Sequence, residues 1–268
     1  MSECYFPPPG MAISNQARRA PADLGLSEEL VERTDRFVKS HPFEGVEQGW
    51  ALWRHGYLVH AEGDFHRTVE VASLRKTWHA MIVGAAIQQG RIPCIDQSIG
   101  SWDKSLEGLH AQASWRHVLT QSAGFDYPYE DYPAFAPGEM WTYSDLNLVH
   151  LCNALASAYG KKDFYDEYAD VAREAYFDAI GLEGWSTMIK WDRSSLMYDG
   201  VRFVFSLENL GRLGLLALAR GSWNGVELIP SWFVEHLETK QTYGMQVNYD
   251  GPNDGKIGLG QYLSLIHI

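Results

Sequence analysis

Ser73 and Lys76 stand three positions apart at the start of an apolar stretch of the chain. On a helix, such positions share one face about 5–6 Å apart, so the lysine amine can reach the serine hydroxyl. A serine becomes a good nucleophile only when a neighbour takes its proton, and a lysine can do so when burial or a nearby charge lowers its pKa. The start of a helix also offers free amide donors to a developing oxyanion. The spacing therefore predicts a serine nucleophile with a lysine proton partner.

The spacing alone leaves another interpretation open. Ser73 would then cap a helix, and Lys76 would be an exposed side chain one turn on. The same spacing recurs at Ser101 and Lys104, in a Gly- and Asp-rich stretch that no apolar helix follows. We therefore expect no chemistry at Ser101.

Four ordered segments of the chain resemble the serine β-lactamase and penicillin-binding-protein family. The first is Ala72–Lys76 with the apolar helix behind it, which is similar to the nucleophile helix of that family. The resemblance spans about residues 24–240 and is closest to the esterase-like, class C-type branch. The other segments are Trp115–Gly124, Pro137–Asp145, and the pair Phe205–Leu216 and Gly221–Trp232.

The resemblance implies a serine acyl-transfer enzyme. Ser73 would be the nucleophile, Lys76 its proton partner, and Tyr143 the base or proton shuttle that also protonates the leaving group. A phenol ordinarily titrates near pH 10, so Tyr143 would need the Lys76 cation beside it. Without this context, Tyr143 would be interpreted as an aromatic residue at a helix start.

Asp145 departs from the family pattern, which has asparagine at this position. The asparagine offers an amide donor to the substrate carbonyl, whereas an ionised aspartate can only accept. We expect Asp145 to hold Lys76 as an ammonium and to leave the base role to Tyr143. The change also favours an ester-type or unassigned substrate over a β-lactam or peptide amide.

Aromatic residues precede the Tyr143 segment. The loop Phe125–Phe135, which contains Tyr127, joins the preceding helix to this segment, and Trp141 follows the loop. Because aromatic side chains commonly line pockets of this kind, we expect Tyr127, Trp141 and Asp145 to contact substrate. The alternative is a plain surface loop.

The C-terminal part lacks a further motif of the family. The family closes its site with a strand bearing KTG, HxG or similar, and residues 239–268 contain no such motif. The final residues, 263–268, resemble translated adapter sequence, and we interpret them as a non-native tail. We therefore expect a truncated copy in which C-terminal sheet strands are missing.

The expected fold is α+β and β-lactamase/transpeptidase-like, with an antiparallel sheet flanked by helices and an all-helical lobe. We expect an irregular arm at 1–22, a discontinuous α/β lobe at 23–70 and 200–262, and a mainly helical lobe at 71–199. The predicted helices cover residues 24–39, 73–89, 114–121, 144–159, 164–180, 206–220 and 231–239, and the predicted strands cover 48–53 and 57–61.

Composition excludes several partners. Against 34 acidic residues there are 22 basic ones, a net charge of −12, so we expect neither nucleic acid nor an anionic membrane as a partner. The three cysteines are far apart and the ten histidines are scattered, so we expect no disulfide, no metal and no cofactor. No apolar run approaches the roughly 20 residues of a membrane span. No signal peptide is visible, which favours the cytoplasm.

Three functions remain open at this point. The first is a serine hydrolase that acts on an ester or amide of a small molecule. The second is a β-lactamase or D-alanyl peptidase, against which Asp145 and the missing signal peptide argue. The third is a non-catalytic binding module of the same fold, which the missing C-terminal motif favours.

Overall fold

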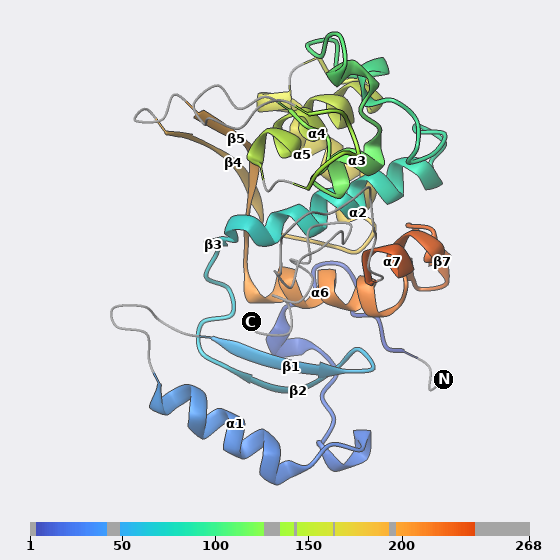
Figure 1. The fold of residues 1–268 in the computed structure, drawn as a ribbon. Helices are drawn as coiled ribbons and strands as arrows, with labels where there is room; N and C mark the ends of the chain where they lie inside the picture. The colour runs from blue at the N-terminus through green and yellow to red at the C-terminus, as the bar shows by residue number, and fades with distance from the viewer. Residues whose placement is uncertain are drawn as a thin grey trace.

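The computed structural model describes residues 4–41, 49–125, 135–141, 144–162, 164–192 and 197–238. A β-hairpin lies between helices α1 and α6, and a helical layer with a second sheet lies beyond α6 (Figure 1). The described strands pair antiparallel throughout, which confirms the predicted α+β class. The division into an arm and two lobes stays a prediction.

The hairpin joins β1 (Trp50–Arg54) to β2 (Tyr57–Glu62), as predicted. Its two turn residues, His55 and Gly56, have φ of 51° and 79°, the left-handed values that a tight primed turn requires. Gly56 is also needed for space, because a Cβ there would lie 1.7 Å from the backbone oxygen of Tyr5. The N-terminal arm therefore packs directly on the turn.

A second sheet was not predicted from the sequence. It has the order β3-β5-β4, with β3 at Val69–Glu70, β4 at Ser186–Asp192 and β5 at Met197–Phe205. Val201, Phe203 and Phe205 are buried, and the residues between them are half-buried. Buried and half-buried residues thus alternate along this part of β5, and an alternation of this kind is typical of a strand. A short hairpin, β6 (Ser222–Trp223) with β7 (Val226–Glu227), lies between the last two predicted helices.

All seven predicted helices are present, with ends that differ by a few residues. Ser27 caps the first, Ser144 the fourth, and Gly90 with φ of 71° follows the second. The helices are α1 (Glu28–Ser40), α2 (Arg75–Gln88), α3 (Trp115–Leu119), α4 (Asp145–Ala158), α5 (Phe164–Ala172) with a π-helical continuation at Arg173–Phe177, α6 (Leu207–Leu218) and α7 (Ser231–Glu238). Short 3-10 turns lie at Ile13–Asn15, Ala22–Leu24, Ala72–Leu74, Ile99–Ser101 and His110–Gln112.

Helix α2 is the centre of the core, because every residue from Arg75 to Ala86 is buried. A helix that is buried on all sides must pack against several elements at once. Gly84 illustrates how close this packing is, since a Cβ there would lie 2.6 Å from the ring of Phe233 in α7. The apolar side of α1 behaves differently: Leu30 and Phe37 are 51% and 61% exposed.

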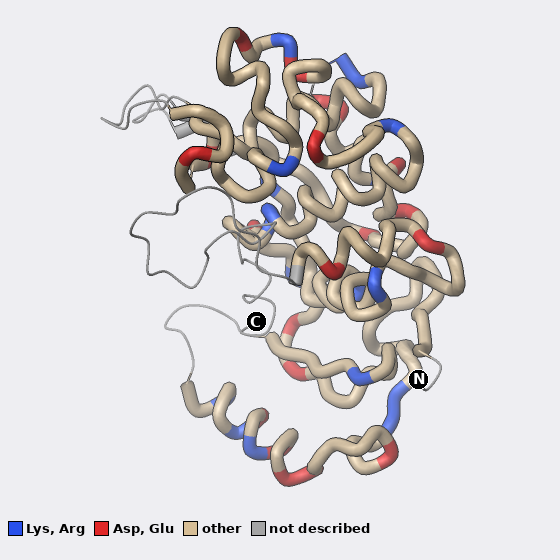
Figure 2. The backbone as a smooth tube through the Cα atoms, turned by 45° about the vertical axis from the view of Figure 1, so that its right-hand side comes forward, with Lys and Arg blue, Asp and Glu red and all other residues tan. Residues whose placement is uncertain are grey.

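Charged residues of the described part are spread over many elements, and α1 carries both signs (Figure 2). None of the described helices has the length and apolar character that a bilayer crossing requires.

Candidate active site

Ser73 lies in the 3-10 turn Ala72–Leu74, immediately before α2. The Nζ of Lys76 donates a hydrogen bond to the Ser73 Oγ at 3.1 Å. The Lys76 side chain is 3% exposed, which excludes the interpretation of an exposed lysine one turn after a cap. The spacing that suggested a pair in the sequence thus produces a contact in the structure.

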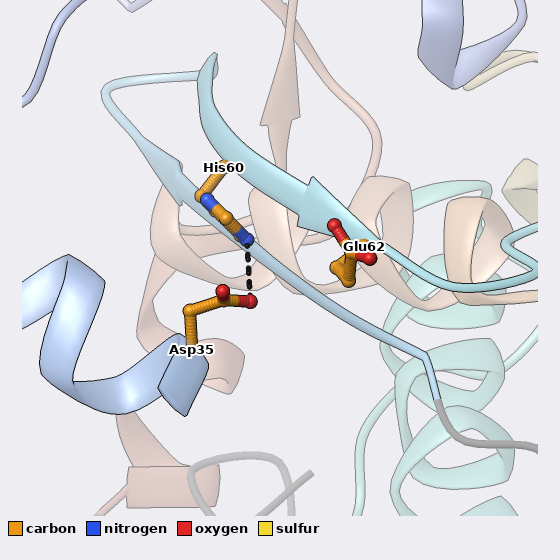
Figure 3. Close-up of side chains that lie close together, drawn as sticks. All are labelled: Asp35, His60 and Glu62. Atoms are coloured by element: carbon orange, nitrogen blue, oxygen red, sulfur yellow. Dashed lines mark hydrogen bonds and ion pairs between the residues drawn. The ribbon is translucent and has the colours of Figure 1, made fainter. Parts of the chain in front are cut away.

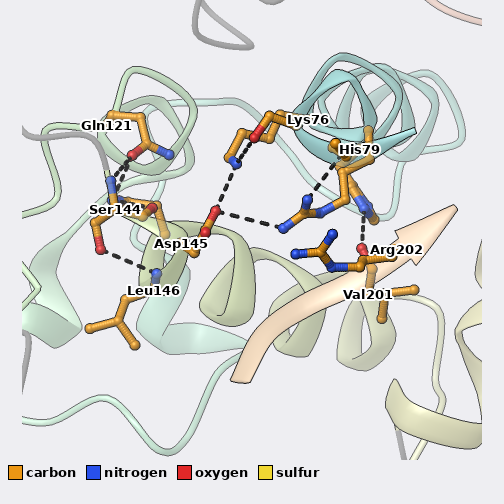
Figure 4. Close-up of polar contacts among 12 residues, drawn as sticks. Lys76, His79, Gln121, Ser144, Asp145, Leu146, Val201 and Arg202 are labelled. Atoms are coloured by element: carbon orange, nitrogen blue, oxygen red, sulfur yellow. Dashed lines mark hydrogen bonds and ion pairs between the residues drawn. The ribbon is translucent and has the colours of Figure 1, made fainter. Parts of the chain in front are cut away.

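Asp145 is the first residue of α4 and faces two cations. Its Oδ1 lies 2.7 Å from Lys76 Nζ and 3.6 Å from an Arg75 guanidinium nitrogen. Figure 4 shows the Lys76 and Asp145 side chains pointing toward each other from α2 and α4. The structure therefore brings Ser73, Lys76 and Asp145 together.

The start of α4 is fixed by Gln121, a residue that the sequence analysis missed. The Gln121 Oε1 accepts from the backbone N–H of Ser144 at 2.6 Å and from Asn147 Nδ2 at 3.3 Å (Figure 4). Gln121 is 3% exposed and has φ of 58°. It lies in the segment that resembles the family, but its residue type gave no sign of this role.

The backbone just before Ser73 is held by charged side chains. Ala72 has φ of 46°, a left-handed value that alanine rarely adopts. Its N–H donates to Glu70 Oε1 at 2.7 Å, and its carbonyl accepts from Arg75 Nη1 at 3.0 Å. Arg202 of β5 donates to the same Glu70 oxygen at 2.7 Å.

His79, one turn after Lys76, is fully buried and joins α2 to β5 (Figure 4). Its Nε2 lies 3.0 Å from the Val201 carbonyl, which can only accept, so Nε2 carries the hydrogen. Its Nδ1 then accepts from the Tyr168 hydroxyl at 2.7 Å. Burial lowers the pKa of His79 to about 3, and the charge of Arg75 adds to this. His79 is therefore a neutral structural residue near neutral pH.

Three other predicted positions stay untested by this geometry. Tyr143 and Tyr127 lie outside the described residues, as does most of the loop between Phe125 and Phe135. Trp141 is described and half-buried, and its contact with substrate stays a prediction.

The second Ser-x-x-Lys match takes a different form. The Lys104 amine donates to the backbone oxygen of Gly100 at 3.2 Å, and Ser101 is the exposed last residue of a 3-10 turn. This geometry agrees with the expectation that no chemistry takes place at Ser101.

Cavities of very different size border the described elements. A small one of about 20 Å³ adjoins Lys76 and Asn147, enough for about one water. A larger one of about 310 Å³ lies between the N-terminal arm and the start of α6. Its lining includes Glu183, Glu208 and Arg212 but none of the predicted site residues.

Asp35, His60 and Glu62 form a group whose ligand atoms lie within 4.8 Å of one another (Figure 3). The Lys39 ammonium lies 2.9 Å from Asp35 Oδ2 and 3.5 Å from Glu62 Oε1. Its hydrogen bond lowers the pKa of Asp35. Lys39 thus supplies the positive charge that a metal would bring, and we interpret the group as an ion-pair network between α1 and β2.

Comparisons with known proteins identify the fold. Neither the protein-family models nor the curated proteins gave a match. Among solved structures, a provisionally named β-lactamase from Bacteroides dorei has a TM-score of 0.66 at 16% identity, covering 83% of this chain and 73% of its own. The chain has the β-lactamase and penicillin-binding-protein fold.

Two further structures have this fold. The octameric penicillin-binding protein homologue from Pyrococcus abyssi has a TM-score of 0.61 at 13% identity, covering 85% of this chain and 64% of its own. The D-stereospecific amidohydrolase from Streptomyces has a TM-score of 0.53 at 16% identity, covering 75% of this chain and 73% of its own. The predicted β-lactamase/transpeptidase-like fold is thus confirmed.

Proposed function

We propose that the chain is a serine hydrolase that forms an acyl-serine intermediate on Ser73 with a small-molecule ester or amide. The observation that carries the proposal is the position of Lys76, whose buried ammonium contacts both the Ser73 hydroxyl and the Asp145 carboxylate. A buried lysine beside a serine at a helix start suits catalysis better than fold stabilisation, because burying a charge is costly. The fold supports the same conclusion.

In the proposed reaction, Tyr143 takes the proton of Ser73 as the Oγ attacks the substrate carbonyl carbon. Lys76 donates to the serine oxygen and forms an ion pair with Asp145, and an ammonium has no lone pair with which to accept the serine proton. Its positive charge favours the phenolate form of Tyr143. Collapse of the tetrahedral intermediate breaks the bond to the leaving group, which Tyr143 protonates. Water then releases the acyl group from Ser73 by the same proton transfers in reverse order.

Asp145 favours esters within this proposal. An ionised carboxylate cannot donate to an amide carbonyl, whereas ester hydrolysis depends less on such a donor because the leaving group is better. Amides stay candidates because one protein of this fold is a D-stereospecific amidohydrolase.

Labelling with a fluorophosphonate tests the proposal directly. Peptide mass spectrometry should place the adduct on Ser73, and Ser73→Ala should abolish labelling. Ser101→Ala is the matched control and should label at the rate of the wild type. An adduct on another serine would contradict the assignment.

The two alternatives have their own tests. A binding module would bind ligand without forming an adduct under these conditions. A β-lactamase would turn over nitrocefin faster than p-nitrophenyl acetate, whereas the proposed esterase shows the opposite preference.

A further inference from the structure

We propose that Glu70 and Arg202 are positioning residues that hold Ala72 in its left-handed conformation and thereby aim the Ser73 hydroxyl. The kinetic consequence of this inference rests on the proposed role of Ser73. The effect of Glu70 and Arg202 on the conformation of Ala72 does not depend on that role, because it is inferred from the contacts around Ala72 alone.

The contacts form a continuous chain from the second sheet to the nucleophile. Glu70 ends β3 and is paired with Val204 of β5, so Arg202 lies two residues further along the neighbouring strand. Arg202 donates to Glu70 Oε1, and that oxygen accepts from the Ala72 N–H. Both distances are 2.7 Å, short for hydrogen bonds and typical of charge-assisted ones.

The conformation that these contacts stabilise is an uncommon one. A non-glycine residue with φ of 46° persists only where its surroundings enforce it, and such residues concentrate at functional sites. Ala72 is exposed, so packing of its methyl group does not enforce this conformation. Its two backbone polar groups are instead held by Glu70 and Arg75. A charged side chain thus holds the Ala72 N–H, and both the guanidinium and the backbone N–H of Arg75 hold its carbonyl, directly before Ser73.

Glu70 has two possible roles, and each requires something different of its side chain. As a positioning residue, it needs only an oxygen that accepts from Ala72. As a mere partner of Arg202, it needs its negative charge. Glu70→Gln keeps the oxygen and removes the charge, whereas Glu70→Ala removes both.

The first measurement is the second-order rate of fluorophosphonate labelling at Ser73. We expect Glu70→Ala to lower it by about ten- to a hundred-fold, since a misplacement of about 1 Å can cost that much. Glu70→Gln should keep at least about a third of the wild-type rate. Ala72→Gly should restore most of the rate in the Glu70→Ala background, because glycine adopts positive φ without strain. Asp170→Ala, which breaks a 2.8 Å ion pair with Arg173 elsewhere, is the matched control and should not change the rate.

The second measurement does not depend on activity. In spectra of the chain with 13C-methyl alanine, the Ala72 signal is identified by its loss in Ala72→Gly, and its carbon shift reports φ. Glu70→Ala should move this signal toward ordinary alanine values, and Glu70→Gln should not. An unmoved signal in Glu70→Ala, or equal rate losses in the two Glu70 variants, would overturn the positioning role. If the wild type forms no adduct, the proposed function fails, and the alanine signal still decides the role of Glu70.

Discussion

The Asp145 carboxylate lies 2.7 Å from the Lys76 ammonium, which in turn lies 3.1 Å from the Ser73 hydroxyl. Ser73 and Asp145, which are 72 positions apart in the chain, thus contact the same ammonium group. In the proposed mechanism, this relationship assigns the base role to Tyr143 and substrate preference to Asp145.

Asp145→Asn should shift substrate preference toward amides. The asparagine Nδ2 can donate to a substrate carbonyl, a hydrogen bond worth about 0.5–1.5 kcal/mol, or roughly two- to tenfold in rate. Turnover of p-nitrophenyl acetate and nitrocefin should be measured side by side, and their ratio should move toward nitrocefin. An unchanged ratio would mean that Asp145 does not face the substrate.

Gln121→Ala should destabilise the protein by about 1–3 kcal/mol, because it removes the acceptor of the half-buried Ser144 N–H and one of the two acceptors of the buried Asn147 amide. Urea unfolding followed by tryptophan fluorescence measures this change. The labelling rate of Ser73 should fall as well, since Ser144 immediately precedes Asp145. A variant with wild-type stability and labelling would show that α4 is positioned by other contacts.

His79 should make the free energy of unfolding depend on pH. The pKa is about 3 in the folded protein and 6.5 when unperturbed, so between these values the unfolded state binds more protons. Stability from this group is fully present above pH 6.5 and falls by about 1.4 kcal/mol per pH unit below it. Unfolding measured from pH 7 to pH 5 should show this slope in the wild type and a flatter one in His79→Gln. Parallel slopes would contradict the assignment.

Two glycines in α6 should respond oppositely to alanine. A Cβ at Gly211 would lie 2.7 Å from the Trp53 ring, which is anchored by a 2.8 Å hydrogen bond to Gln16, so Gly211→Ala should cost about 1–3 kcal/mol. At Gly214 nothing lies within 4 Å of a Cβ, and Gly214→Ala should stabilise the protein by up to about 1 kcal/mol. Thermal melts of the two variants provide the comparison. Equal shifts in the same direction would show that α6 does not pack on Trp53 as described.

Local chemistry could be predicted from the sequence. The strands of the first hairpin, the helix starting at residue 144 and the Ser73–Lys76 spacing each depend on a few neighbouring residues. The proximity of Asp145 to Lys76 was expected only through the resemblance to a known family.

Contacts between distant segments could not be predicted in this way. Glu70 meets Arg202 across 132 residues, and Gln121 meets Ser144 from a loop, so neither pairing leaves a local pattern. Strand β5 did leave one, the alternation from Val201 to Phe205, but it lies between the predicted helices 164–180 and 206–220, where neither helix nor strand was predicted.

The burial of α2 has a consequence for how the site can be lost. Ser73 directly precedes a helix that packs on nearly all sides, and Lys76 lies in its first turn, so this turn cannot fray without disturbing the core. Backbone amides of such a helix exchange with solvent mainly through global unfolding. The labelling competence of Ser73 and the cooperative unfolding transition should therefore disappear at the same urea concentration.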